Sequence, residues 1–282
     1  LFGEAGVSGN GGWAALQGIL FDLAPGASFA ALAHYHDTRY IALQGSGFGA
    51  ANGEWGVYLT SQIIVNAHCD LCCYYDFCQS TWLKYRTDAP SNTMQAGLNI
   101  AINPGRNANI NFKYQFKKKE KNNHTDELVN GLVPFYSSRF RLSGSCQVFD
   151  FLKLKSEVNF VINHSKSTNY KKIGFLIFQD ISINIKRTGL GFDARVAYFD
   201  TDSYEERLYA YENDLYYSFT INSHYGKGCR AYLLLRYSYK FIHFWVRISQ
   251  SYYFDRKIVS SGLEEIASPH KTELKMQLMF KF

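Results

Sequence analysis

The sequence lacks any long apolar run. No stretch approaches the roughly 18 uncharged apolar residues that a membrane-spanning helix needs. The nearest candidate, residues 11–33, is interrupted by Asp22 and Pro25. The chain also opens on Leu1 and Phe2 without the basic segment and cleavage site of a signal peptide. The lack of a long apolar run excludes transmembrane helices. Because no signal peptide is visible, we expect the numbering to start inside a mature or incomplete chain.

Enzyme motifs are missing as well. The chain contains neither a G-x-S-x-G elbow nor an HExxH helix. Ser137, Ser138 and the Ser260–Ser261 step read as ordinary strand or loop residues. No internal repeat of the solenoid type is present either. The sequence therefore predicts no catalytic residue, no cofactor and no metal site, and one domain over residues 1–282.

The most informative feature that is present is alternation at the C-terminus. Apolar residues occupy every second position, at Leu274, Met276, Leu278, Phe280 and Phe282. The intervening positions include Glu273, Lys275, Gln277 and Lys281, and only Met279 breaks the polar series. In a strand, successive side chains point to opposite faces, so this tail is a ribbon with one apolar and one largely charged side. A terminal strand that ends in Phe resembles the C-terminal strand of bacterial outer-membrane β-barrels.

The same period recurs along the chain, as in residues 109–117, 152–160, 173–186 and 231–240. Aromatic residues make up 17% of the sequence, whereas the mean hydropathy is only −0.22. This combination suits a barrel whose apolar outside is averaged against a polar inside. A soluble β-sandwich would show the same period, so it remains an alternative.

Loop lengths separate these alternatives. Short links are expected near residues 24–26, 65–67, 103–106, 147–149 and 187–189, and longer polar links at 37–53, 79–92, 118–133 and 164–169. Short turns on one side and long loops on the other are typical of outer-membrane barrels. Counting back from the C-terminus requires an extra turn at Glu212, Asn213 and Asp214. The prediction is a transmembrane antiparallel up-and-down β-barrel of about 16 strands, with 14 as the alternative and more if strands precede Leu1.

The charged faces of the strands would line a lumen. The candidates are Lys113, Arg139, Arg141, Lys153, Lys155, Arg236, Arg247 and Lys275. Aromatic residues such as Tyr216, Tyr217 and Trp245 are expected in girdles at the membrane boundaries. The five lysines between Lys113 and Lys121 fit a solvated strand end, or a site for lipid phosphate or nucleic acid.

Three clusters leave their chemistry open. Cys69, Cys72, Cys73 and Cys78 are candidates for disulfides, for free apolar thiols or for a metal site, although their spacing matches no zinc motif. His34 and His36 share a strand face without an identifiable third ligand. An acidic stretch fits loop and lumen charges, or Ca²⁺ ligands, and comprises Asp200, Asp202, Glu205, Glu206, Glu212 and Asp214.

Several strings resemble one family in particular. They are residues 82–91, 199–204, 210–214, 225–228 and 260–266, and they are similar to the barrel portion of Bacteroidota outer-membrane proteins that carry a helix-hairpin-helix region. The likeness covers most of the chain. It implies a barrel without catalytic residues. Longer members place the helix-hairpin-helix region in front of the barrel, so nucleic acid would be a partner only through a region absent from this sequence.

The sequence thus favours a non-enzymatic barrel in the bacterial outer membrane, with both termini periplasmic. It would act as a channel, a scaffold or the membrane anchor of a larger surface, secretion or uptake assembly. Expected partners are outer-membrane lipid, the barrel-assembly machinery through the C-terminal strand, and other outer-membrane or periplasmic subunits. An N-terminal periplasmic region would then lie outside this sequence. The alternatives are an outer-membrane enzyme with its site on a loop or at the rim, and a soluble binding module.

Overall fold

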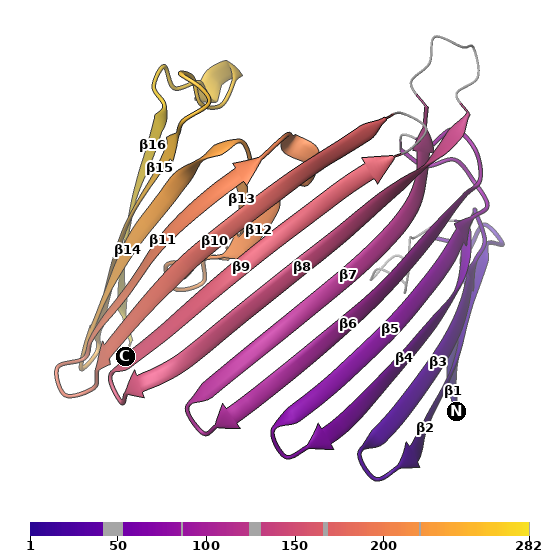
Figure 1. The fold of residues 1–282 in the computed structure, drawn as a ribbon, viewed down its shortest axis with the longest axis horizontal. Helices are drawn as coiled ribbons and strands as arrows, with labels where there is room; N and C mark the ends of the chain where they lie inside the picture. Colours follow the sequence, from indigo (N-terminus) through magenta and orange to yellow (C-terminus); the bar gives the residue numbers. More distant parts are fainter. Residues whose placement is uncertain (42–52, 86, 124–130, 166–168, 220, 282) are drawn as a thin grey trace. The chain divides into compact units, whose positions relative to one another are not determined.

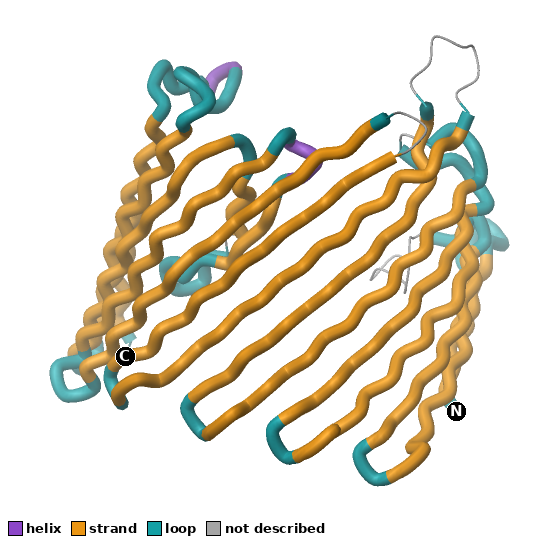
Figure 2. The backbone as a smooth tube through the Cα atoms, in the orientation of Figure 1, coloured by secondary structure: helices purple, strands orange, loops and turns teal. Residues whose placement is uncertain are grey.

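The computed structural model describes residues 1–41, 53–85, 87–123, 131–165, 169–219 and 221–281. This part of the chain is almost entirely strand, with two short 3-10 helices, η1 (Tyr204–Glu206) and η2 (Gly262–Glu264) (Figures 1 and 2). The strands are β1 (Phe2–Val7), β2 (Trp13–Ala24), β3 (Ala27–His36), β4 (Glu54–Asn66), β5 (Cys69–Ser80), β6 (Ser91–Gly105), β7 (Ala108–Asn122), β8 (Leu132–Phe149), β9 (Leu152–Ser165), β10 (Tyr170–Ile185), β11 (Leu190–Thr201), β12 (Leu208–Tyr211), β13 (Ile221–His224), β14 (Lys227–Tyr239), β15 (Ile242–Tyr253) and β16 (His270–Phe280).

The strand order follows the sequence. A 14-stranded sheet runs from β1 to β11 and continues through β14, β15 and β16, while β12 and β13 pair only with each other. The pairs whose register is defined are antiparallel throughout. An order in which each strand pairs with its neighbour in sequence is the topology of up-and-down barrels. The predicted all-β, antiparallel, up-and-down fold and its 16 strands are therefore confirmed.

Two of the 16 strands lie outside the main sheet. The extra turn at Glu212, Asn213 and Asp214 does separate two strands, β12 and β13, but these are only four residues long and form a separate two-stranded sheet. The physical reason is pairing, because β11 pairs directly with β14 and leaves no edge of the main sheet free for β12 and β13. The main sheet accordingly has the alternative number of 14 strands.

The predicted alternation of short and long connections is present, except that residues 166–169 form a connection no longer than the turn at 186–189. Residues 25–26, 67–68, 106–107, 150–151, 186–189 and 240–241 make the short turns. Residues 8–12, 37–53, 81–90, 123–131, 166–169, 202–226 and 254–269 make the connections at the opposite strand ends. The first short turn is Pro25–Gly26, in which Gly26 has φ +82°, a left-handed conformation that glycine adopts without strain.

By contact density the chain forms two compact units, which we describe separately. Unit 1 comprises Leu1–Ile102, Phe112–Phe140 and Asn163–Lys171, and unit 2 comprises Asn103–Asn111, Arg141–Ile162 and Lys172–Phe282. Within the described residues, none of the helices is long and apolar enough to cross a membrane.

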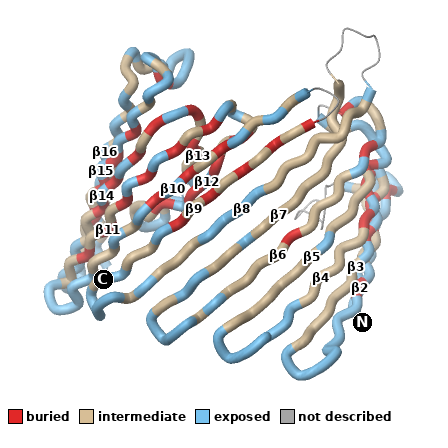
Figure 3. Tube along the Cα trace, viewed as in Figure 1, coloured by how far each residue is buried: buried red, intermediate tan, exposed pale blue. Residues whose placement is uncertain are grey.

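In unit 2 the usual polarity of a protein is inverted. The apolar side of β16 is exposed, with Leu274, Met276, Leu278 and Phe280 at 50–62% exposure, whereas its polar side is half-buried. Strands β9, β10, β11, β14 and β15 show the same alternation of buried and exposed residues (Figure 3). The buried set includes Glu157, Asn159, Asp193, Arg195, Arg230, Arg247, Ser249 and Ser251. We call the side of this sheet that carries these residues the polar face. Charged residues are rarely buried in soluble proteins, so they need partner groups here that compensate for the loss of water. The strand pattern predicted for the C-terminus is confirmed up to Phe280, while Phe282 lies outside the described residues.

Unit 1 also exposes apolar side chains, some of them near its short turns. Leu20, Leu23, Ile64 and Val65 are examples. Its buried polar residues lie at the other ends of the strands, at His34, His36, Glu54, Ser80 and Ser91.

Candidate functional site: an insert clamped to the polar face of unit 2

The site centres on the connection between β11 and β14, residues 202–226, which we call the insert. It contains η1, β12 and β13. Its two ends meet at one point of the sheet, where the Thr201 backbone N donates to Gly226 O at 2.9 Å and the Gly226 N donates to Thr201 Oγ1 at 2.8 Å. Beyond this point β11 and β14 pair without interruption, starting at Asp200 and Lys227. The insert is therefore an addition to a continuous sheet.

The first part of the insert is held by apolar contacts. Leu208 and Ala210 of β12 are buried in one cluster with Val161 of β9, Leu176 and Phe178 of β10, and Ala197 and Phe199 of β11. Burying one leucine side chain stabilises a structure by about 1.5–3 kcal/mol. The polar face thus carries an apolar patch, and β12 covers it.

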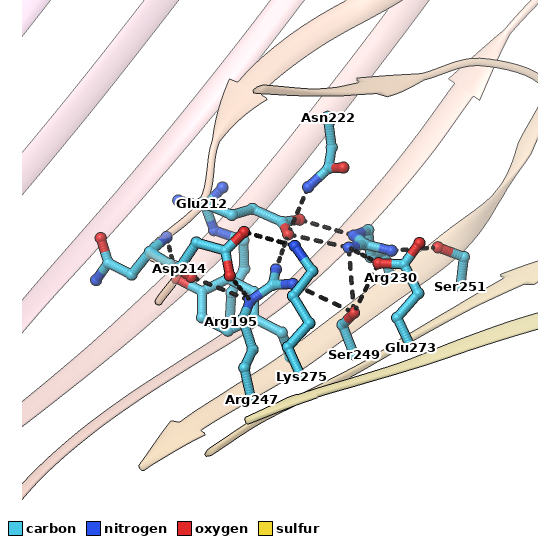
Figure 4. Close-up of polar contacts among 12 residues, drawn as sticks. Arg195, Glu212, Asp214, Asn222, Arg230, Arg247, Ser249, Ser251, Glu273 and Lys275 are labelled. Carbon is cyan, nitrogen blue, oxygen red and sulfur yellow. Dashed lines mark hydrogen bonds and ion pairs between the residues drawn. The ribbon is translucent and has the colours of Figure 1, made fainter. Parts of the chain in front are cut away.

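The second part is held by Glu212, which is only 1% exposed. Arg230 donates from Nε to Glu212 Oε1 at 2.8 Å and from Nη2 to Oε2 at 3.1 Å, so the pairing is bidentate. Arg247 Nη2 also donates to Glu212 Oε2, and Asn222 Nδ2 of β13 donates to the same oxygen at 2.7 Å (Figure 4). One carboxylate of the insert therefore binds two guanidinium groups from adjacent strands, β14 and β15.

Asp214 makes the next attachment along the insert. Lys275 Nζ of β16 lies 2.8 Å from Asp214 Oδ2, and Arg247 Nε lies 3.9 Å from Oδ1. The backbone takes part as well, because Arg247 Nε donates to the Asn213 carbonyl at 3.1 Å. Leu215 packs against the cluster formed by Tyr232, Leu234 and Trp245. These contacts extend the insert to the last strand of the sheet.

The sheet itself supplies further partners for its arginines. Arg230 donates from Nη1 to Ser251 Oγ at 2.8 Å and from Nη2 to Ser249 Oγ at 3.3 Å, and Glu273 lies 3.8 Å from Nη2. Arg195 pairs with Asp180 on the neighbouring strand and stacks on Phe178, with its Cζ 3.7 Å from the ring centroid. Buried charges that are paired and hydrogen-bonded avoid most of the desolvation cost that isolated ones incur.

Two carboxylates of the insert, Glu212 and Asp214, are stabilised in their ionised form. Burial alone would raise the pKa of Glu212, but the hydrogen bond from Arg230 and the charges of Arg230 and Arg247 outweigh it and lower this pKa. Burial would also raise the pKa of Asp214, but the hydrogen bonds from Lys275 and the Leu215 backbone, together with the charges of Arg247 and Lys275, outweigh it and lower this pKa. Burial instead lowers the pKa of His224 in β13 to about 4, so this imidazole is neutral at pH 7. We call the ion pairs of Glu212 and Asp214 with Arg230, Arg247 and Lys275 the clamp. Its carboxylates are ionised, whereas His224 is neutral.

Some predicted lumen residues come together on the polar face, and others do not. Arg247 and Lys275 meet in the clamp. Arg236 pairs with Asp193 at 2.8 Å, and Lys155 and Arg141 lie 3.1 and 3.5 Å from Glu157. Lys113, Arg139 and Lys153 are exposed. That these residues line a lumen stays a prediction.

Sequence reasoning missed the centre of the site. Arg230 continues the alternating polar positions of β14, so the period of two could have identified it. Its pairing with Glu212 could not be inferred in this way, because the two residues are far apart in sequence. Glu212 and Asp214 bind cationic side chains, which agrees with their interpretation as lumen charges, and no cluster suited to a metal ion occurs in the described part of the chain.

Two aromatic residues were misplaced. Tyr216 lies in the insert and stacks on Trp245, a buried residue, at 5.7 Å, so neither belongs to a boundary girdle.

The histidine pair of unit 1 lies on one buried face, as its spacing predicted, with ring centroids 5.5 Å apart. His34 Nε2 lies 3.4 Å from Glu54 Oε1, and Lys84 Nζ lies 2.8 Å from Glu54 Oε2. An ammonium group in this position balances the carboxylate, so the arrangement is an ion-pair cluster.

The cysteines contribute no bridge to the structure. All six are free thiols, including Cys69, Cys72, Cys73 and Cys78, the candidates for disulfides. These four lie on the single strand β5, where Cys69 and Cys73 share one face and Cys72 and Cys78 the other.

Fold and site define a class: an antiparallel up-and-down β-sheet protein with exposed apolar faces and a charged face that is covered by its own insert. No family model matches the chain, and no curated protein matches it. Among solved structures, CdiB from Acinetobacter baumannii is similar over 99% of this chain and 52% of its own length, at 10% identity and a TM-score of 0.45. This chain thus spans about half the length of that protein. The resemblance to the helix-hairpin-helix family stays a prediction.

Proposed function

We propose that the chain is the membrane-embedded part of a bacterial outer-membrane protein, a β-barrel that acts as a non-enzymatic channel. The observation that carries this proposal is the inverted polarity of unit 2. Exposed faces rich in Ile, Leu and aromatic residues suit contact with lipid, whereas the opposite faces bury charge.

A soluble sandwich accounts for the same strands less well. It would bury the apolar faces against a second sheet and leave the charged faces in water. In unit 2 the described residues do the reverse, with Leu274 and Ile248 exposed and Arg247 and Ser249 buried. Contiguous exposed apolar surface of this kind marks an interaction with a membrane or a partner.

The orientation follows from the turns. β1 runs toward the connection at residues 8–12, which lies on the side opposite the short turns, and β16 ends at Phe280, opposite Ile242 and next to the short turn at residues 240–241. Short turns are periplasmic in bacterial barrels, so we propose periplasmic termini. The C-terminal strand, Leu274 to Phe282, would be the segment that the barrel-assembly machinery recognises.

The test is reconstitution. The purified chain should require detergent to stay monomeric, should migrate differently in SDS gels with and without boiling, and should conduct ions in planar bilayers. A monomer that is stable in plain buffer would refute the membrane proposal. A folded but silent barrel would favour the second candidate, a scaffold or membrane anchor, which the insert supports because it occupies the polar face.

A further inference from the structure

We propose that the insert is the constriction of this channel, that Glu212 holds it in place, and that its acidic residues suppress a preference for anions that the sheet would otherwise have. This inference rests on the proposed channel function. It assigns to residues 202–226 the control of both the size and the charge of the passage.

The first argument is the reach of the insert. Its contacts fall on six neighbouring strands of the main sheet, from Val161 on β9 to Lys275 on β16. Adjacent strands lie about 4.8 Å apart, so the contacts extend across about 24 Å of the sheet. A surface loop that served only to connect β11 and β14 would not need this reach, because the strand ends are already joined by hydrogen bonds at Thr201 and Gly226.

The second argument is that the sheet is prepared for the insert. The polar face carries an apolar patch, including Leu176, Phe178 and Phe199, at the place where Leu208 and Ala210 pack. Without the insert this patch, like the cluster of Tyr232, Leu234 and Trp245 that Leu215 covers, would face water. The complementary surfaces show that the docked position is specific.

The third argument is charge. Of the residues in the clamp, the sheet supplies Arg230, Arg247 and Lys275 against Glu273, whereas the insert supplies Glu212 and Asp214. The whole insert has five acidic residues and one arginine. With the insert docked, the cations of this part of the face are neutralised. With the insert removed, the same face would attract small anions such as chloride.

The structure provides a clean way to remove the insert. Because Thr201 and Gly226 are hydrogen-bonded neighbours, residues 203–224 can be replaced by a two-residue Asn-Gly turn without changing the pairing of β11 with β14. Glu212→Gln is a milder variant that keeps the shape of the side chain and removes its charge. Glu264→Gln makes the same change at an exposed position in the connection between β15 and β16, and serves as the matched control.

The experiment measures single-channel conductance in potassium chloride, and the reversal potential in a potassium chloride gradient, for folded protein selected by its mobility in unboiled SDS gels. The deletion should raise conductance several-fold and shift the reversal potential toward anion selectivity. Glu212→Gln should shift both in the same direction by less, and Glu264→Gln should equal the parent.

The outcomes separate the two proposals. A parent chain that never gives the folded, heat-modifiable form refutes the channel proposal itself. A deletion variant that is folded but has the conductance and selectivity of the parent, or stays silent, overturns the constriction while leaving the barrel intact. If the deletion variant does not fold, the Glu212→Gln variant provides the test. If its conductance and selectivity equal those of the parent chain, the inference is overturned.

Discussion

Unit 1 and unit 2 are built from the same kind of strand, yet they bury their charges differently. Unit 2 has a described insert whose Glu212 joins two buried arginines. In unit 1 the buried carboxylate Glu54 pairs instead with Lys84, whose side chain is 32% exposed. In both units a buried charge of the sheet pairs with a group from a connection between strands, Lys84 in unit 1 and Glu212 in unit 2. Only in unit 2 does that connection reach across several strands.

The largest difference between the units should appear when each carboxylate is removed. Glu212→Ala leaves two buried guanidinium groups with one partner fewer, and breaking a buried pair in this way costs about 3–5 kcal/mol. We expect amide hydrogen exchange in β12 and β13 to rise accordingly. Glu54→Ala should cost less, because Lys84 regains water. Equal losses of protection from amide hydrogen exchange around Glu212 and Glu54 would mean that the two units do not differ in how they hold their buried charges.

A charge on the apolar face should harm both units alike. Ile177→Arg in unit 2 and Ile19→Arg in unit 1 place an arginine where lipid is expected, at a cost of about 2–4 kcal/mol near the bilayer midplane. The measurement is the fraction folded in lipid vesicles. Ser182→Arg is the matched control, since it puts the same side chain on the other face of β10, opposite Asp193. In a soluble protein, the two exposed-face variants would instead stay within about 0.5 kcal/mol of the parent.

Apolar docking of the insert should be weaker than its ionic clamp. Leu208 is 6% exposed and packs on the patch of the polar face, so Leu208→Ala should destabilise docking by about 2 kcal/mol. Hydrogen exchange in β13 would report the loss. Ile221→Ala, at an exposed position of the same hairpin, should change exchange little. A larger effect at Ile221 would mean that the insert docks through its other side.

Acid should loosen the insert, and this loosening should be smallest near neutral pH. The pKa of His224 is lowered to about 4 mainly by burial, so docking that requires the neutral ring weakens as the pH falls from about 6.5 toward 4. The lowered pKa values of Glu212 and Asp214 add a second loss at still lower pH, as these carboxylates protonate.

Tryptophan emission can follow this change. Trp245 stacks on Tyr216 of the insert, whereas Trp13, Trp55 and Trp82 lie in unit 1. The pH-dependent part of the emission should therefore disappear in Trp245→Phe. If that part persists in the variant, the acid transition belongs to unit 1.

Much of the fold could be predicted because it depends on local rules. The period of two in β16 and the Pro25–Gly26 turn are properties of short segments, and the structure has both. The insert could not be predicted in the same way. Its strands are short, and a count based on turns alone assigned them to the main sheet. The clamp depends on Glu212 reaching Arg230 and Arg247, which are 18 and 35 residues away.

The sequence alone determined that this chain forms antiparallel ribbons, each with an apolar and a polar side, joined in order by alternating short and long connections, because side-chain direction and turn conformation are decided within a few residues. Only the tertiary structure decided which charges are buried and which segment buries them. That choice depends on bringing Glu212 and Asp214 against three separate strands, and no local pattern records the distance between groups that meet only after the chain has folded.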